Sequence, residues 1–138
     1  MTHLYRPRAA LAACSLLVAL AGCSRAVHPV KGTVRFKDGT PLTVGRVVVD
    51  SDDGKSGSWG AIRPDGSFEM GTMAPDDGVP AGTYRVYLTN TTTPPPADLS
   101  VPFTPRPLVN PRFNDKDTSG LAFEVPKETT WEIVVEKP

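Results

Sequence analysis

The sequence is poor in the two residue types that most often carry catalysis and metal binding. Its 138 residues include only two histidines, His3 and His28, and two cysteines, Cys14 and Cys23. Ser-His-Asp and Cys-His catalysis need a histidine base, and structural zinc needs clustered cysteine or histidine. We therefore predict a protein without enzymatic activity and without a cofactor, and we assign no catalytic residue.

An excess of charge of one sign and a helical pattern are also missing. The chain has 15 basic and 15 acidic residues, so it lacks the positive field that nucleic acid attracts, and we expect no nucleic-acid partner. Long windows with apolar residues at helical spacing do not occur. Twelve glycines and 15 prolines are instead typical of a chain with many turns. These features predict an all-β fold.

The N-terminal segment has the composition of a signal peptide. Arg6 and Arg8 precede an apolar run over residues 9–23, which is interrupted only by Ser15 and Gly22. A helix of that length spans roughly 22 Å, whereas the hydrocarbon core of a membrane needs about 30 Å. A basic start before a short apolar run is typical of a secretory signal, and we assign residues 1–22 to it.

The end of this segment, Leu20-Ala21-Gly22-Cys23, resembles the lipobox of bacterial lipoproteins. The resemblance implies cleavage before Cys23 and attachment of acyl chains such as palmitate to that cysteine, which would anchor the chain in a membrane. Ser24, in place of Asp, implies an outer-membrane location facing the periplasm. Residues 23–29 would then form a lipidated tether. The alternative is an ordinary cleaved signal with a chance cysteine.

Beyond the tether, residues 30–138 contain short runs of alternating apolar and polar side chains, bounded by turn residues. Trp131 is in phase with Ile133 and Val135, which favours a place in the core, and Tyr84 is expected to bury its ring with the hydroxyl at the rim. The runs predict one antiparallel β-sandwich of about seven strands, prealbumin-like or Ig-like. The predicted strands cover residues 30–37, 44–49, 59–62, 67–70, 83–89, 121–125 and 131–136.

A proline-rich segment interrupts this pattern at residues 90–111. Its seven prolines would remove amides from any β-ladder that they joined. We predict a long loop with polyproline II stretches and an edge strand near residues 99–103. Such a segment could dock a protein partner, because polyproline II loses little entropy on binding. The alternative is a stiff surface loop.

Several short motifs follow one another in the order strand, turn, buried strand, hairpin and strand. They are Val30-x-Gly32-x-Val34, Asp38-Gly39-x-Pro41-Leu42, Gly45-x-Val47, Arg63-Pro64-Asp65-Gly66-Ser67-Phe68 and Pro80-Ala81-Gly82-Thr83-Tyr84-Arg85-Val86. In this order they resemble the carboxypeptidase regulatory-like domain, a transthyretin-like β-sandwich. With its lipobox, the whole chain looks like a small planctomycete-type lipoprotein. The resemblance covers residues 30–88, and its motifs encode turns and core rather than chemistry.

One segment begins like a calcium-binding loop. Asp115, Asp117 and Ser119 place oxygen ligands at positions 1, 3 and 5, and Gly120 stands at position 6. Position 12 is Pro126, where such a loop needs a bidentate glutamate. The alternative is a polar turn whose side chains cap backbone amides. We assign no metal site and keep these three residues as a calcium candidate; the acidic group Asp50, Asp52 and Asp53 is a second one.

Aromatic side chains offer one further kind of site. Trp59 follows a Gly/Ser loop, and if it is exposed on a sandwich face together with Tyr87, the two rings could stack on a sugar.

The sequence as a whole predicts a lipid-anchored protein of the cell envelope with a non-enzymatic binding or structural role. Its partners would be the membrane, through the anchor, and an envelope protein or glycan. One alternative is a carbohydrate- or calcium-dependent adhesion module. Another is an envelope hydrolase, which would need several carboxylates converging in a pocket with perturbed pKa values. The ligand-binding residues stay unknown at this level.

Overall fold

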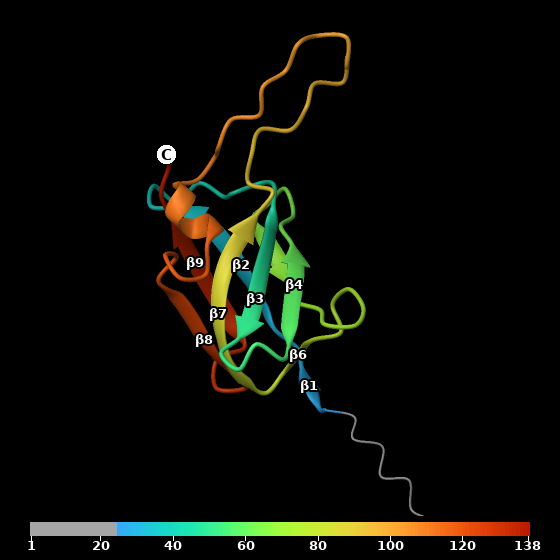
Figure 1. Cartoon of the computed structure of the whole chain (residues 1–138), viewed down its shortest axis with the longest axis vertical. Helices are drawn as coiled ribbons and strands as arrows, with labels where there is room; N and C mark the ends of the chain where they lie inside the picture. Colours follow the sequence, from blue (N-terminus) through green and yellow to red (C-terminus); the bar gives the residue numbers. More distant parts are fainter. Residues whose placement is uncertain (1–24) are drawn as a thin grey trace, which may run out of the picture.

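The computed structural model describes residues 25–138. Their two larger β-sheets pack face to face (Figure 1), and a two-stranded ribbon is added to them. The larger sheet has the strand order β4-β3-β7-β8, with every neighbouring pair antiparallel. Its strands are β3 (Arg46–Ser51), β4 (Gly57–Ala61), β7 (Gly82–Thr89) and β8 (Leu121–Val125). This sheet presents one face to the core and the other to solvent.

The smaller sheet has the order β5-β2-β9 and brings the two ends of the domain together. It consists of β2 (Lys31–Phe36), β5 (Ser67–Glu69) and β9 (Thr130–Val135). The prediction of an all-β sandwich is confirmed, but a purely antiparallel arrangement is wrong, because β2 and β9 run parallel over six residue pairs. Alternation of side chains is the same in either direction, so the sequence pattern carries no information on this point.

All seven predicted strands are present, with ends that differ by a few residues. A short ribbon, β1 (Val27–His28) paired with β6 (Val79–Pro80), is added to them. The predicted edge strand at residues 99–103 is wrong: this stretch is exposed and unpaired, and only an isolated bridge between Thr92 and Pro107 joins the two sides of the loop. Prolines that lack an amide cannot supply a ladder there.

A short 3₁₀ helix, η1 (Pro111–Asn114), was not expected from the sequence. The Asn110 side chain caps it by accepting a hydrogen bond from the Arg112 amide. Proline in the first turn favours such a helix, because its missing amide has no partner to lose there. The helix matters for the core, since it buries the Phe113 ring between the sheets.

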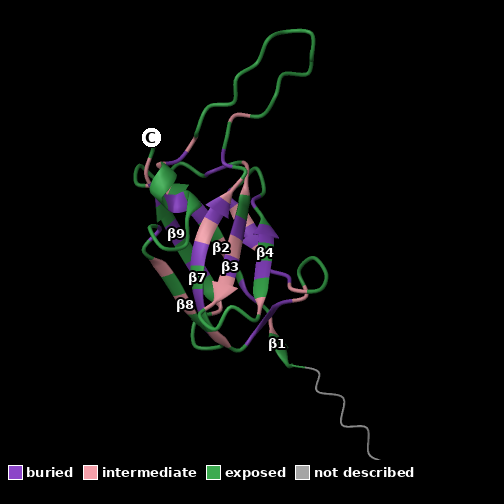
Figure 2. Cartoon of the chain, viewed as in Figure 1, coloured by how far each residue is buried: buried purple, intermediate pink, exposed green. Residues whose placement is uncertain are grey.

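The core lies between the two sheets and is built from alternate residues of each strand (Figure 2). Trp131 is buried, as predicted, and its ring stacks on Phe123 of the opposite sheet with centroids 4.5 Å apart. The Tyr84 ring is also in the core. Its hydroxyl is buried rather than at the rim, where it donates a hydrogen bond of 2.8 Å to the carbonyl of Pro80.

The chain enters the sandwich at β1, at one end of the molecule, and the proline-rich loop extends from the opposite end (Figure 1). The predicted signal segment 1–22 and Cys23 lie outside the described residues. Of the predicted tether, Val27 and His28 are held in strand β1. Within residues 25–138, no helix has the length and apolar character needed to span a bilayer.

Candidate functional site

The solvent-facing side of the larger sheet carries a row of three apolar side chains, Trp59, Val48 and Tyr87, which we call the aromatic row. Val48 of β3 is the cross-strand partner of both rings, Trp59 on β4 and Tyr87 on β7. Neighbouring strands lie about 4.8 Å apart, so the two rings are anchored roughly 9.6 Å from each other. Trp59 is 39% exposed, and Val48 and Tyr87 are half-buried.

The aromatic row is bordered on one side by a cation. Arg46, two residues before Val48, lies on the same face, and its guanidinium carbon is 4.8 Å from the centroid of the Trp59 ring. Among the described residues, no carboxylate lies within ion-pair distance of this guanidinium. The cross-strand neighbours of Arg46 are the small residues Ala61 and Thr89, which leave space around it.

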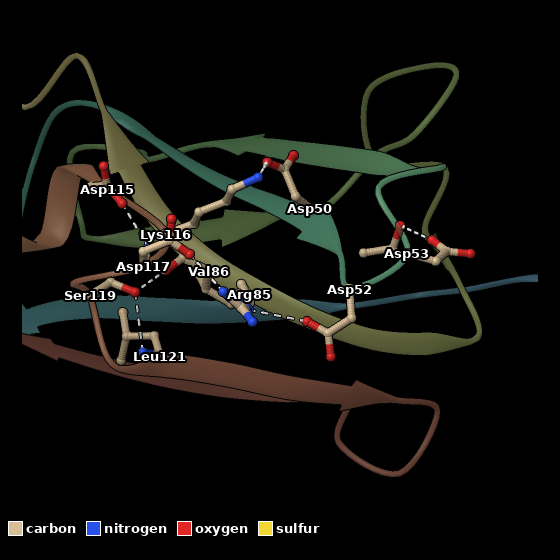
Figure 3. A network of polar contacts seen from close by, with 11 residues as sticks. Asp50, Asp52, Asp53, Arg85, Val86, Asp115, Lys116, Asp117, Ser119 and Leu121 are labelled. Carbon is tan, nitrogen blue, oxygen red and sulfur yellow. Dashed lines mark hydrogen bonds and ion pairs between the residues drawn. The ribbon is translucent and has the colours of Figure 1, made fainter.

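On its other side the aromatic row is bordered by Asp50 of β3 and Arg85 of β7, two residues away from Val48 and Tyr87. Figure 3 shows the group of ion pairs to which both belong. Arg85 of β7 bridges Asp52 and Asp117, with nitrogen–oxygen distances of 3.2 and 2.6 Å. Lys116 reaches Asp50 at 3.4 Å. Arg85 thereby ties the loop after β3 to the loop before β8.

Tyr87 links the apolar and the charged parts of this face. Partial burial raises the pKa of its hydroxyl, and the neighbouring Asp50 carboxylate adds to the rise. Like that of any tyrosine, the hydroxyl is protonated at neutral pH and can both donate and accept a hydrogen bond. The condition that the sequence analysis set for sugar stacking, a solvent-facing side shared by Trp59 and Tyr87, is met. Binding of a sugar to them stays a prediction.

Each side chain of the calcium candidate already has a hydrogen-bond or ion-pair partner within the protein. The Asp115 side chain accepts a hydrogen bond of 2.7 Å from the amide of Asp117, whose own carboxylate pairs with Arg85. The Ser119 hydroxyl is buried and donates to the carbonyl of Val86 at 2.5 Å. These contacts are those of the alternative, a polar turn that caps backbone groups.

The three carboxylates of the second acidic group likewise have separate partners. Asp53 accepts hydrogen bonds from the Ser51 hydroxyl and the Lys55 amide, which lower its pKa, whereas Asp50 and Asp52 pair with cations elsewhere. Among residues 25–138, no group of three or more His, Cys, Asp or Glu side chains is arranged to hold a metal ion.

Several exposed aspartates share one local structure in which the carboxylate accepts hydrogen bonds from a hydroxyl and an amide two residues later. Asp38, Asp65 and Asp98 do so with Thr40, Ser67 and Ser100 respectively. These donors lower the carboxyl pKa values, because they stabilise the ionised form. A general acid needs the opposite shift, so these carboxylates hold turns and are not suited to proton donation.

The proline-rich loop, residues 90–110, forms a projecting arm (Figures 1 and 2). Its base is a narrow ribbon, in which the Thr93 amide donates to the Arg106 carbonyl and the Leu108 amide to the Thr91 carbonyl. Its outer part exposes three large apolar side chains, with exposed fractions of 81% for Leu99, 52% for Val101 and 39% for Phe103. The proline content predicted a loop but gave no indication of this projection.

A hollow with a volume of about 510 Å³ lies at the end where the chain enters. It is lined mainly by the loop after β3 and the residues that lead into β7, including Asp52, Asp53 and Thr83. His28 of β1 also lines it. Asp53 accepts a hydrogen bond within its own turn, and Asp52 pairs with Arg85. Both carboxylates that line the hollow therefore have partners.

No protein-family model matches the chain, and no curated protein matches it in sequence. Among solved structures, it is similar to the crystal structure of BcpA*(D312A), the major pilin subunit of Bacillus cereus. The sequence identity is 11% and the TM-score 0.44, over 80% of this chain and 30% of the pilin chain. This chain therefore spans less than a third of that pilin's length.

Proposed function

We propose that this chain is a lipid-anchored, non-enzymatic binding module of the bacterial cell envelope, which presents its proline-rich arm to a protein partner. The observation that carries the proposal is the placement of the chain entry and the arm at opposite ends of one sandwich (Figure 1). An anchor at Cys23 would lie beside the first of these ends and leave the other free. Outer-membrane sorting and the resemblance to carboxypeptidase regulatory-like lipoproteins belong to the same proposal.

The short distance between the predicted anchor and the first strand supports this orientation. Val27 stands four positions after Cys23 in the sequence, and extended chain of that length covers at most about 14 Å. A lipidated Cys23 would therefore hold β1 close to the membrane surface. The arm would then point away from the bilayer, toward other components of the envelope.

The surface of the arm supports a binding role. Contiguous apolar patches on a surface mark sites of interaction, and the arm exposes Leu99, Val101 and Phe103 within five residues of sequence. The arm is also partly pre-organised: Asp98 accepts hydrogen bonds from both the amide and the hydroxyl of Ser100, which fixes the turn that carries Leu99. Pre-organisation lowers the entropy cost of docking.

The anchor is tested by membrane fractionation and palmitate labelling of the full chain in bacterial cells. Cys23→Ser is expected to abolish labelling and to release the chain from the outer-membrane fraction. Cys14→Ser is the matched control, because it removes the other cysteine and should change neither readout. Continued labelling of the Cys23→Ser variant would refute the lipid anchor.

The arm is tested by photo-crosslinking in intact cells that express the full chain. A photoreactive residue in place of Phe103 is expected to give an adduct with an envelope protein, which disappears when Leu99 and Val101 are both changed to serine. The control places the same probe at Lys127, an exposed residue of the turn between β8 and β9. Figure 1 shows that turn at the end of the sandwich opposite the arm. Absence of an adduct at position 103, or the same adducts from both positions, would refute docking through the arm.

A further inference from the structure

We infer that the aromatic row and Arg46 form a binding site for a glycan chain that carries carboxylate groups. The site lies on the solvent-facing side of the larger sheet, away from the arm, and goes beyond the docking role proposed above. It does not depend on the arm. Three features favour such a ligand: the spacing of the rings, the free cation beside them and the polar groups on the opposite border.

The spacing of the two aromatic side chains suits a polymer rather than a single sugar. Trp59 and Tyr87 are two strand spacings apart, roughly 9.6 Å, with only Val48 between them. Pyranose rings present flat faces of C–H groups, which pack on aromatic rings, and a chain of linked sugars repeats such faces at regular intervals. An extended glycan lying across the strands can therefore contact both rings and pass over the low Val48 side chain.

Arg46 provides the charge complementarity. Its guanidinium packs on Trp59 at 4.8 Å and has no carboxylate partner among the described residues. Most other arginines of the described chain are paired, as Arg63 is with Glu69 and Arg85 with Asp117. A planar guanidinium binds a carboxylate through two parallel hydrogen bonds, which makes a carboxylate-bearing sugar the ligand that suits this position.

The opposite border suits neutral hydroxyl groups. Asp50 and Lys116 form an ion pair at 3.4 Å, so their charges balance while their outer lone pairs and protons stay available to sugar hydroxyls. The Tyr87 hydroxyl, which lies on the same face, adds a donor and an acceptor. This paired border offers no free cation to a carboxylate, which places the anionic group of the glycan at the Arg46 end.

The test measures retention of the full chain, purified in detergent micelles, by two glycan probes that separate the possible sources. One is insoluble peptidoglycan sacculi, and the other is immobilised polygalacturonate, with its methyl ester as the neutral counterpart. The wild-type chain is expected to bind at least one anionic probe. If polygalacturonate binds, its methyl ester should bind several-fold more weakly.

Two variants locate the site. Trp59→Ala is expected to weaken binding about tenfold or more, as loss of an aromatic anchor does, and Trp59→Phe should restore part of it. Arg46→Ala should weaken binding to the anionic probe and leave binding to the methyl ester unchanged. The matched controls are Val134→Ala, which removes an exposed apolar side chain of the other sheet, and Arg106→Ala, which removes a cation of the arm. Both controls should bind like wild type.

Three results would overturn the inference. The first is failure of the wild-type chain to bind sacculi and polygalacturonate. The second is binding that is unaffected by Trp59→Ala and Arg46→Ala in variants with wild-type melting curves. The third is self-association that Trp59→Ala abolishes, which would mean that a second copy of the chain covers the row. None of these results would bear on the proposed lipid anchor or on docking through the arm, which are tested separately by labelling and crosslinking.

Discussion

The Phe123 and Trp131 rings stack across the sandwich, with planes only 7° from parallel and centroids 4.5 Å apart. Phe123 belongs to the edge strand β8 of the larger sheet and Trp131 to the edge strand β9 of the smaller one. The pair therefore closes one open side of the molecule. The Trp131 indole nitrogen also donates a hydrogen bond of 2.9 Å to the carbonyl of Glu128, in the turn between the two strands.

Trp131→Ala is expected to be among the most destabilising single substitutions in this chain. The fully buried indole fills the space between the sheets, and removing such a side chain costs about 3–5 kcal/mol of unfolding free energy. Phe123 is half-buried, so Phe123→Ala should cost less, about 1–2 kcal/mol. Chemical denaturation of both variants measures the difference. A smaller loss for Trp131→Ala than for Phe123→Ala would contradict the role assigned to the pair.

Gly32 is predicted to tolerate no side chain. A Cβ atom at this position of β2 would overlap the Trp131 carbonyl oxygen and lie 2.7 Å from Cζ of Phe68, both in the core. Gly32→Ala should therefore destabilise the fold by about 1–3 kcal/mol through overpacking. Gly57→Ala is the control within another strand, because its Cβ would meet nothing nearer than 3.3 Å. Equal melting temperatures for the two variants would show that the close approach at Gly32 is relaxed in solution.

Calcium is predicted to leave thermal stability unchanged. Binding at Asp115, Asp117 and Ser119 would require Asp117 to leave Arg85 and the buried Ser119 hydroxyl to leave the Val86 carbonyl. A ligand at 100 times its dissociation constant adds about 2.7 kcal/mol to stability, which is readily seen as a rise in Tm. Melting of the full chain in millimolar calcium and in chelator should give the same Tm. A rise of several degrees in calcium would restore the calcium candidate.

Asp38 is predicted to titrate far below an ordinary aspartate. The Thr40 hydroxyl and amide donate to its carboxylate, and Lys137 lies 3.1 Å away, which together lower the pKa from 3.8 to about 2. Because the folded-state pKa is depressed, the stabilisation is complete above the unfolded value and is lost as pH falls through about 2. Carboxyl chemical shifts measured by NMR give the midpoint. Thr40→Ala should raise it, and an unchanged midpoint would exclude the hydroxyl as the main cause.

The outer part of the arm is predicted to be dispensable for folding. Leu99, Val101 and Phe103 are exposed, so changing all three to serine should alter the unfolding free energy by no more than about 0.5 kcal/mol each. Phe113, which follows the arm and is buried, provides the contrast: Phe113→Ala should cost about 3–5 kcal/mol. Denaturation midpoints distinguish the two regions. A large loss in the triple variant would mean that the arm packs on the sandwich in solution.

The parts of this structure that the sequence predicted are those set by local rules. Alternation located the seven strands, and turn residues such as Asp65-Gly66 located a hairpin, because both depend on neighbouring residues alone. The parallel pairing of β2 with β9 joins residues about a hundred positions apart and leaves no local trace. The helix η1 did leave one, since Asn110 followed by Pro111 is a typical start for a short helix.

The candidate site was predictable only in part for the same reason. The sequence named Trp59 and Tyr87 as a pair, but their alignment through Val48 depends on the register of three strands. Arg46 was not predicted as a binding residue. Whether an arginine in a strand is free to bind a ligand depends on its cross-strand neighbours, which the sequence alone does not identify. Its small cross-strand partners, Ala61 and Thr89, are the feature that leaves it accessible.

The parallel alignment of β2 and β9 determines how the molecule would respond to mechanical force. A pull between the chain entry and the arm acts along β2, so the ladder with β9 is loaded in shear and its hydrogen bonds resist together instead of peeling apart one by one. The ribbon of β1 and β6 has only two residue pairs and lies ahead of β2. This ribbon would open first and would lengthen the tether before the sandwich itself bears the load.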